Sequence, residues 1–519
     1  MYLISFLQSF HTTTPYKVIS DEIDVITKEI VDPGSDTEDE IERPEGTEDE
    51  PLEELDTEKT IVLEEQGPQV LKSLLLGLPS PTSLLWSLTT AGINLALVCM
   101  TIDMVYRAPL LFESHDLSFA RVGYVSHNSA KLLIREPRVN ELPIYVSFRY
   151  ADKPLAAESG YGPPDTAWKH AMSISHSEVS EETDFTYSAT LSDLHADTRY
   201  QYALSNNHTG HFITAPRIGH VSKQNGGKFT FLTTSCIKAR TPYNPLSHPL
   251  HIPGFDHLAK WIPSLKAHFM LFLGDFIYID VPHRFGIDTE TYRTEYRRVY
   301  ASPDWPLVSE NLPWIHVLDD HEIANDWDSN STGIYAAAAD PFQHYQVSAN
   351  PPVARHGETY FTFTQGPASF FMMDTRRYRS PENKNATDVT KTMLGSQQLA
   401  DLLHFLHAPL PKGVKWKIIA SSIPFTKNWH FGGEDTWGGY LIERQLVLEA
   451  MWEAGARGYG VVVLSGDRHE FAATAFPPPK GSKFPASATV YEFSTSPLSM
   501  FYLPYRTYKQ IDDEDVCIK

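Results

Sequence analysis

Polar side chains able to bind metal or phosphate follow several apolar, strand-like segments of the C-terminal half of the chain. They are Cys236, Asp275, the pair Asp320-His321, and Asp467. Taken singly, each has an ordinary explanation, since Asp often caps a helix and Cys is often a small buried apolar residue. Taken as a series, they indicate one site, because α/β sheets gather ligand-binding groups at the carboxyl ends of their strands.

The types of these side chains indicate the kind of metal. Asp275 follows Gly274, whose freedom lets the chain turn just past a strand, and a carboxylate there can bridge two cations. Tyr278 lies three residues further on, so one turn brings both residues to the same ion. Thiolate from Cys236 and phenolate from Tyr278 favour iron or another transition metal over magnesium.

A second pair of candidate ligands lies further along the chain. Asp467 and His469 are two residues apart, so on an extended segment their side chains project to the same side. His469 completes the softer site, and Asp467 suits a harder second ion.

The order of these motifs resembles the PhoD-like alkaline phosphatases, members of the calcineurin-like and purple-acid-phosphatase-like metallophosphoesterases. The motifs are Ser-Cys at 235–236, Gly-Asp-x-Ile-Tyr at 274–278, Asp-Asp-His-Glu at 319–322, Asp-Thr-Arg-x-Tyr-Arg at 374–379 and Ser-Gly-Asp-x-His at 465–469. The resemblance covers about residues 113–505. It implies an α/β fold, a four-layer αββα metallophosphoesterase domain, with Fe³⁺ and Ca²⁺ as cofactors and other divalent transition metals as the alternative.

The resemblance also implies roles for single residues. The iron would be held by Cys236, Asp275, Tyr278 and His469. Asp275 would bridge to calcium, which Asp467 and either Asp320 or Asn325 would also bind. His321 would face the phosphate, where it stabilises the transition state or protonates the leaving group.

The sequence departs from the family pattern in two places. The best-known members carry a phosphate-gripping Arg directly after Gly-Asp, where this chain has Phe276. Arg284, Arg376 and Arg468 are the candidate substitutes. The chain also stops at Lys519, soon after a predicted strand, so either an edge strand is absent or the chain is truncated.

The segments before residue 219 read as three further regions. Residues 1–70 include a long acidic run and are predicted to be disordered. Residues 71–112 contain an uncharged stretch, 84–102, about as long as a bilayer core is thick, which predicts a membrane segment. Residues 113–218 read as short strands of a fibronectin-III-like or immunoglobulin-like β-sandwich, with Tyr200 or Tyr202 locking a corner. The family resemblance implies that residues 219–519 form the phosphatase domain.

Bulk composition excludes some classes of function. The net charge of −22 argues against a nucleic-acid-binding surface. The three cysteines do not form a disulfide framework. Sequons at Asn207, Asn330 and Asn385 are compatible with a catalytic domain on the lumenal or extracellular side of a membrane.

Three functional hypotheses fit these features. The first is a membrane-tethered phosphomonoesterase or phosphodiesterase with a metal-activated water. The second is a phospholipase-like diesterase at the membrane surface. The third is a non-catalytic membrane-anchored binding protein on a decayed phosphatase fold. Metal analysis with a small substrate panel separates these classes, while the substrate and the oligomeric state stay open.

Overall fold

The computed structural model describes residues 2–29, 53–151, 167–223 and 226–518. The chain divides into two compact units, Met1–Asp103 and Met104–Lys519. The second unit carries all the candidate site residues.

The first unit differs from the predicted disorder of residues 1–70. Helix α1 (Tyr2–Thr12) precedes two antiparallel strands, β1 (Tyr16–Glu29) and β2 (Glu53–Glu65), and helix α2 (Val70–Leu76) follows. Within the acidic composition, β-branched residues such as Val18, Ile23 and Val62 recur, and these favour strands. Residues 30–52, the centre of the acidic run, lie outside the described part.

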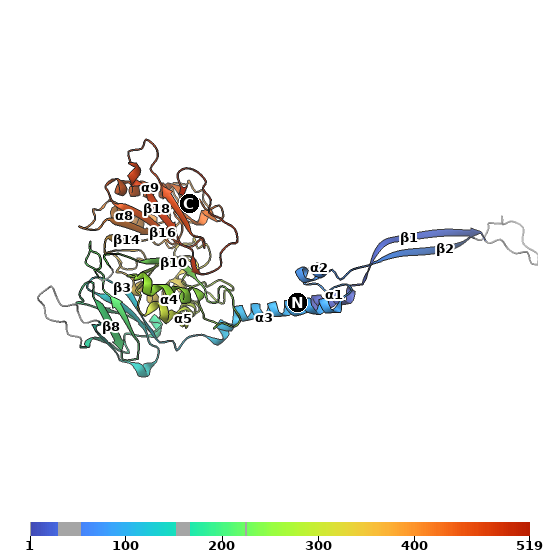
Figure 1. Ribbon diagram of the computed structural model, residues 1–519, viewed down its shortest axis with the longest axis horizontal. Helices are drawn as coiled ribbons and strands as arrows, with labels where there is room; N and C mark the ends of the chain where they lie inside the picture. The colour runs from blue at the N-terminus through green and yellow to red at the C-terminus, as the bar shows by residue number, and fades with distance from the viewer. Residues whose placement is uncertain (1, 30–52, 152–166, 224–225, 519) are drawn as a thin grey trace, which may run out of the picture. The chain divides into compact units, whose positions relative to one another are not determined.

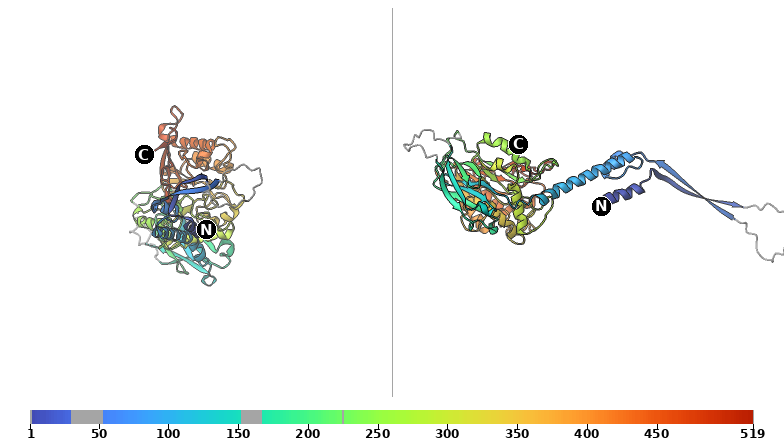
Figure 2. Two further views of the ribbon diagram at one scale, coloured as in Figure 1. Left: turned by 90° about the vertical axis from the view of Figure 1, so that its right-hand side faces the viewer. Right: turned by 90° about the horizontal axis from the view of Figure 1, so that it is seen from below.

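Helix α3 (Leu84–Leu111) contains the predicted membrane segment and continues nine residues beyond it. Its mean hydropathy reaches 1.6, and only 6% of that window is buried. Among the described residues it is the one helix long and apolar enough to cross a membrane. Figures 1 and 2 draw it as one unbroken helix. Membrane insertion itself stays a prediction.

Residues 119–213 form two small antiparallel sheets. One has the order β3-β4-β7, with strands Phe119–Val125, Ala130–Arg135 and Thr186–Leu191. The other has the order β6-β5-β8-β9, with strands Lys169–Ile174, Ile144–Tyr150, Arg199–Leu204 and Thr209–Ile213. Side chains from both sheets share one hydrophobic cluster. The Tyr200 hydroxyl accepts a hydrogen bond from the backbone N–H of His195 at 2.9 Å. The fibronectin-III-like or immunoglobulin-like type of this region stays a prediction.

The candidate ligands begin on a four-stranded parallel sheet of order β12-β11-β10-β19. Its strands are Trp314–His316, Met270–Phe272, Leu232–Ile237 and Pro497–Ser499. An aromatic-rich core joins it to helices α4 (Pro253–Leu265), α5 (Thr289–Tyr300), α6 (Trp305–Ser309) and α7 (Tyr335–Tyr345).

A seven-stranded sheet of order β13-β14-β15-β16-β18-β17-β20 forms the other half of this region. Its strands are Phe361–Gln365, Ala368–Met372, Trp416–Ala420, Gly460–Ser465, Val490–Ser494, Ala472–Phe476 and Val516–Cys517. Strands β13 and β14 pair antiparallel as a hairpin. Helices α8 (Gly395–His407) and α9 (Leu441–Ala456) share a second core with this sheet (Figure 1).

A third apolar cluster lies between the two sheets. It contains Leu271 and Ile315 from the smaller sheet, with Phe370, Ile418 and Leu464 from the larger. Helices, sheet, sheet and helices therefore follow one another, the predicted mixed α/β layering. Strands of both sheets deliver their carboxyl ends to one place.

Candidate metal centre

The predicted ligands come together just past the ends of four parallel strands. Cys236 lies in β10, Asp275 follows β11, Asp320 follows β12, and Asp467 with His469 follows β16. Three overlapping groups have ligand atoms within 4.8 Å of one another: Cys236, Asp275 and His469; Asp275, Asp320 and His321; Asp319, Asp320 and Asp467. Asp275 and Asp320 each belong to two groups, so the arrangement suits two neighbouring cations.

The first group is centred on Asp275. Its Oδ2 accepts hydrogen bonds from the Cys236 thiol at 3.3 Å and from the Tyr278 hydroxyl at 2.8 Å. The Tyr278 hydroxyl also lies 2.9 Å from Nε2 of His469. These four residues are the ones predicted to hold the softer ion, and their donor atoms converge within one small buried space.

The backbone at these positions is unusual. Cys236, Asp275, Asp467 and His469 all have φ between 54° and 72°, a region that non-glycine residues seldom adopt. Such conformations persist where the surrounding structure imposes them, often at functional sites. Gly274 has φ 98°, and a Cβ there would lie 2.3 Å from Cβ of Asp319, so only glycine allows β11 and β12 to approach this closely.

Burial without a cation shifts the titration of the ligands. It raises the pKa of the Cys236 thiol and of the Tyr278 phenol, and the charge of Asp275 adds to both effects. Burial also raises the pKa of Asp275, and it raises that of Asp467 to about 7. A bound cation would reverse these shifts by favouring the ionised ligands.

Three carboxylate oxygens test whether the site fits a metal. Oδ1 of Asp275, Oδ1 of Asp320 and Oδ2 of Asp467 are buried and make no hydrogen bond. Two of them lie near a guanidinium, Oδ1 of Asp320 at 3.4 Å from Arg376 and Oδ2 of Asp467 at 3.9 Å from Arg468, whereas Oδ1 of Asp275 has no such neighbour among the ion pairs of the described residues. Buried carboxylate oxygens are costly unless something compensates their charge. With the thiol, phenol and imidazole beside them, these oxygens fit one softer and one harder cation.

A fixed positive charge lies beside the group of Asp319, Asp320 and Asp467. Arg376 is fully buried, and its guanidinium binds Asp319 at 2.5 Å and Asp435 at 2.5 and 3.0 Å. It also lies 3.4 Å from Asp320 and 3.7 Å from Asp467. Part of the negative charge that a second cation would meet is therefore already neutralised.

His321 lies beside the first group on a loop after β12. Its ring centroid is 4.2 Å from that of Tyr278, and its Nδ1 is 2.7 Å from Oδ1 of Asp280. Burial lowers the pKa of His321, but the charges of Asp320, Asp275 and Asp280 outweigh burial and raise it to about 11. His321 is therefore positioned to donate a proton.

Asn325 is exposed, and its backbone N–H donates to Oδ2 of Asp280 at 2.7 Å. Asp320, by contrast, is buried within two of the three ligand groups. Of the two residues that the sequence left open as calcium ligand, the geometry favours Asp320.

Sequence reasoning assigned no role to Asp280, Glu322 or Asp435. The buried carboxylate of Glu322 accepts the backbone N–H groups of Asp275 at 3.0 Å and Asp319 at 2.8 Å, and so ties together the loops after β11 and β12. Glu322 is the last residue of the Asp-Asp-His-Glu motif, so the sequence could have indicated a role for it. Asp435 is the last residue of a short 3₁₀ helix, Gly433–Asp435, which contains no recognisable motif.

Phe276 occupies the position after Gly-Asp, where a phosphate-binding Arg was expected from the family pattern, and it lies in the aromatic core. The Phe276 side chain is fully buried, with its ring 5.2 Å from Tyr300 and 5.7 Å from Trp305. The Phe276 side chain is therefore part of the core shared with α5 and α6.

The three candidate substitutes for that Arg have different surroundings. Arg376 is buried among carboxylates. Arg284 donates to the Tyr292 hydroxyl and the Ile323 carbonyl. Arg468 lines a groove of about 430 Å³ together with His469. Its guanidinium donates to the Gly432 carbonyl at 3.3 Å and to the Phe431 carbonyl, and its Nε lies 3.9 Å from Oδ2 of Asp467. Of the three, Arg468 is the one that lines this groove beside a candidate ligand.

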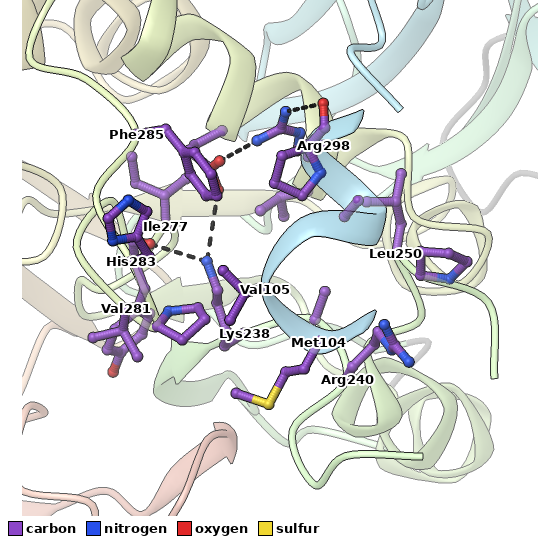
Figure 3. A pocket seen from close by; sticks show the side chains of 18 of the residues that line it. Met104, Val105, Lys238, Arg240, Leu250, Ile277, Val281, His283, Phe285 and Arg298 are labelled. Carbon is purple, nitrogen blue, oxygen red and sulfur yellow. Dashed lines mark hydrogen bonds and ion pairs between the residues drawn. The ribbon is translucent and has the colours of Figure 1, made fainter. Parts of the chain in front are cut away.

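A second cavity, of about 70 Å³, touches the metal centre from another side. It is lined by Tyr278, Val281 and Phe285 and by the last turns of α3 (Figure 3). Lys238 extends into this region, where it donates to the Tyr278 carbonyl at 3.0 Å. The end of α3 therefore packs against the loop that carries a candidate ligand.

Comparison with known proteins agrees with the fold and the motifs. The family model described as PhoD-like phosphatase matches residues 231–518, more than half of the chain. The chain belongs to the PhoD-like phosphatase family, which supports hydrolysis of phosphate esters. No curated protein matches the chain.

Two solved structures are similar to the chain. The structure of PhoD has 20% sequence identity and a TM-score of 0.54 over 73% of this chain and 77% of that chain, a likeness of fold. A purple acid phosphatase from yellow lupin (Lupinus luteus) seeds has 10% identity and a TM-score of 0.47, over 76% of this chain and 68% of that one.

Proposed function

We propose that the chain is a metal-dependent hydrolase that cleaves phosphate esters with a metal-activated water. The observation that carries this proposal is the convergence of candidate ligands from both sheets, with three buried carboxylate oxygens that make no hydrogen bond. A pair of cations in such a site would polarise the phosphoryl oxygens and lower the pKa of a bound water.

The ligands divide by chemistry into two sets. Cys236, Tyr278 and His469, with Asp275, suit Fe³⁺, whereas Asp467 and Asp320, with Asp275 as the bridge, suit Ca²⁺. Other divalent transition metals are the alternative for either position. The Arg376 guanidinium near the second set would make the harder cation the more weakly bound of the two.

The remaining residues act on the substrate. His321, oriented by Asp280, donates a proton to the leaving oxygen. Arg468, in the groove beside His469, binds a phosphoryl oxygen in place of the Arg that other family members carry after Gly-Asp. Phosphomonoesters and phosphodiesters both present such an oxygen, and both are proposed as substrates.

The experiment that tests this function combines metal analysis with hydrolysis. Purified chain is analysed for iron and calcium and assayed with one phosphomonoester and one phosphodiester. His321→Ala is compared with His344→Ala, a histidine on α7 that lies in none of the ligand groups. Metal-loaded protein that hydrolyses neither ester would refute the enzyme and favour a binding protein on this fold.

We also propose that α3 anchors the chain in a membrane, with the catalytic unit on the lumenal or extracellular side. The length and hydropathy of α3 support the anchor, and exposed sequons at Asn207, Asn330 and Asn385 are compatible with the side. The chain should then resist alkaline carbonate extraction and shift in mobility after glycosidase treatment. Release by carbonate would contradict the anchor, and an unmodified chain would contradict the assigned side.

A further inference from the structure

A loop beside the metal centre exposes a run of large apolar side chains. Phe501, Tyr502, Leu503 and Tyr505 have exposed fractions of 52%, 75%, 36% and 61%. Single exposed apolar residues are ordinary, but a contiguous group marks an interaction surface. We call residues 501–506 the aromatic loop.

The aromatic loop borders the route to a candidate ligand. The Phe501 ring meets the His469 ring edge to face, with centroids 4.9 Å apart. Tyr502 and Tyr505 line the groove of about 430 Å³ that also contains Arg468 and His469. A molecule that reaches the metal centre through this groove therefore passes the aromatic loop.

The aromatic loop and the residues directly after it carry positive charge. Residues 496–511 include Arg506 and Lys509 and no acidic residue, while the acidic run 512–515 follows them and Glu470 lines the same groove. Tyrosine rings are suited to the headgroup level of a bilayer, where an apolar ring and a polar hydroxyl are both satisfied. Arg and Lys beside them attract anionic lipid.

The end of α3, the helix proposed above as a membrane anchor, also lies near the metal centre. The last turns of α3, including Met104 and Val105, line the cavity that Tyr278 and Val281 also line (Figure 3). Val281 and Met500, the residue just before the aromatic loop, pack on one small cluster with Cys236 and Tyr278. The end of α3 and the residue before the aromatic loop therefore both lie near Tyr278.

From this juxtaposition we infer that the aromatic loop inserts into the interface of an anionic phospholipid bilayer, and that the groove admits a phosphate ester presented at that surface. The substrate class rests on the proposed hydrolase function, whereas the insertion of the loop does not. A lipid ester would keep its phosphate at the metal centre while its acyl chains stay in the bilayer beside Tyr502 and Leu503.

The first experiment tests insertion without any assay of activity. The full chain, with Cys99→Ser and Cys517→Ser, receives Tyr502→Cys, carries an environment-sensitive dye there, and is placed in nanodiscs of phosphatidylcholine with and without phosphatidylserine. Lipids brominated on their acyl chains should quench the dye, more strongly with phosphatidylserine. A dye at Leu446→Cys, on an exposed position of α9, is the matched control. Equal quenching at the two positions, or none at Tyr502→Cys, would overturn the inference.

The second experiment tests the substrate class. Tyr502→Ser/Tyr505→Ser is compared with Ile442→Ser/Leu446→Ser, which removes exposed apolar side chains from α9. Each is assayed on a diacyl phosphate ester in nanodiscs and on its short-chain, water-soluble analogue. The ratio of bilayer to soluble rate should fall about tenfold in the loop variant only, which corresponds to about 1.4 kcal/mol.

The outcomes of the second experiment separate the two proposals. An unchanged ratio, or wild-type protein that cleaves only the soluble ester, would overturn the lipid substrate while leaving the hydrolase. Wild-type protein that cleaves neither ester would refute the hydrolase and with it the substrate class, while the dye experiment still decides the insertion.

Discussion

Nδ1 of His321 lies 2.7 Å from Oδ1 of Asp280, and the second oxygen of the same carboxylate accepts the backbone N–H of Asn325 at 2.7 Å. The hydrogen bond fixes the orientation of the imidazole and leaves Nε2 as the atom available to a substrate. The negative charge of Asp280 also contributes to the raised pKa of His321. One carboxylate thus sets both the direction and the acidity of the proposed proton donor.

His321→Ala should lower kcat by about 10²–10⁴-fold, the usual contribution of a general acid, while both metals are retained. Metal analysis and steady-state kinetics on the same preparation check this outcome. Loss of the metals with the activity would make His321 a ligand instead.

Asp280→Asn should shift the alkaline limb of the pH–rate profile to lower pH. The amide removes a negative charge that raises the pKa of His321, so the imidazolium loses its proton at lower pH. The profile is measured from weakly acidic to strongly alkaline conditions. An unchanged alkaline limb with lower kcat would mean that Asp280 acts on geometry alone.

The iron assignment predicts a coloured protein. Tyr278→Phe should shift or bleach the visible charge-transfer band of the iron-loaded chain, because it removes the phenolate and keeps the ring. Cys236→Ser should weaken iron retention, since a hydroxyl is a poorer ligand than a thiolate. Tyr296→Phe is the matched control, since Tyr296 is buried and its hydroxyl makes no hydrogen bond. A colourless, active enzyme holding only zinc or manganese would exclude iron, and an unaltered spectrum in both ligand variants would exclude these residues.

Removal of metal should reverse the pH dependence of stability. In the metal-free chain, burial raises the pKa of Asp467 from 3.8 to about 7 and that of Glu322 from 4.5 to about 7. Both pKa values are higher in the folded state than in the unfolded state. The stability that these two groups contribute to the fold is therefore greatest below pH 4 and is lost as pH rises to about 7. Thermal unfolding of chelated and metal-loaded protein at pH 5 and about pH 8 checks this. The loaded protein should gain stability over the same range, since metal binding needs ionised ligands.

Arg376→Ala should destabilise the fold by about 3–5 kcal/mol, because Asp319 and Asp435 would be left buried without their partner. Arg377→Ala is the control, since the neighbouring Arg377 is only partly buried and donates to the Gly357 carbonyl. Denaturant unfolding measures both variants. Equal, small losses in the two would show that the buried carboxylates are neutralised in another way.

The parts of the site that the sequence predicts are those with a local pattern. Apolar segments ending in Cys236, Asp275 and Asp467 mark strands and their carboxyl ends, and the structure has strands there. Which strand ends meet depends on the order of the strands in the sheet, and hydrophobic periodicity does not give that order. The order of the motifs and its resemblance to a known family indicated that these ends form one site.

The parts that the sequence misses depend on tertiary contacts. Asp435 meets Arg376 across 59 residues of chain, and no local signal announces that pair. Phe276 stands in a ligand-bearing loop, but its direction is set by the aromatic core on the far side of β11. The acidic composition of residues 1–70 favoured a prediction of disorder, although the same region contains β-branched residues in the paired strands β1 and β2.

The candidate ligands come from both sheets, with Cys236 and Asp275 on the smaller one and Asp467 and His469 on the larger. A cation held by Cys236, Asp275 and His469 would be a cross-link between chain segments about two hundred residues apart. The two sheets would then separate only after the ion leaves. The resistance of this unit to unfolding and to proteases would rise and fall with the supply of free metal around it.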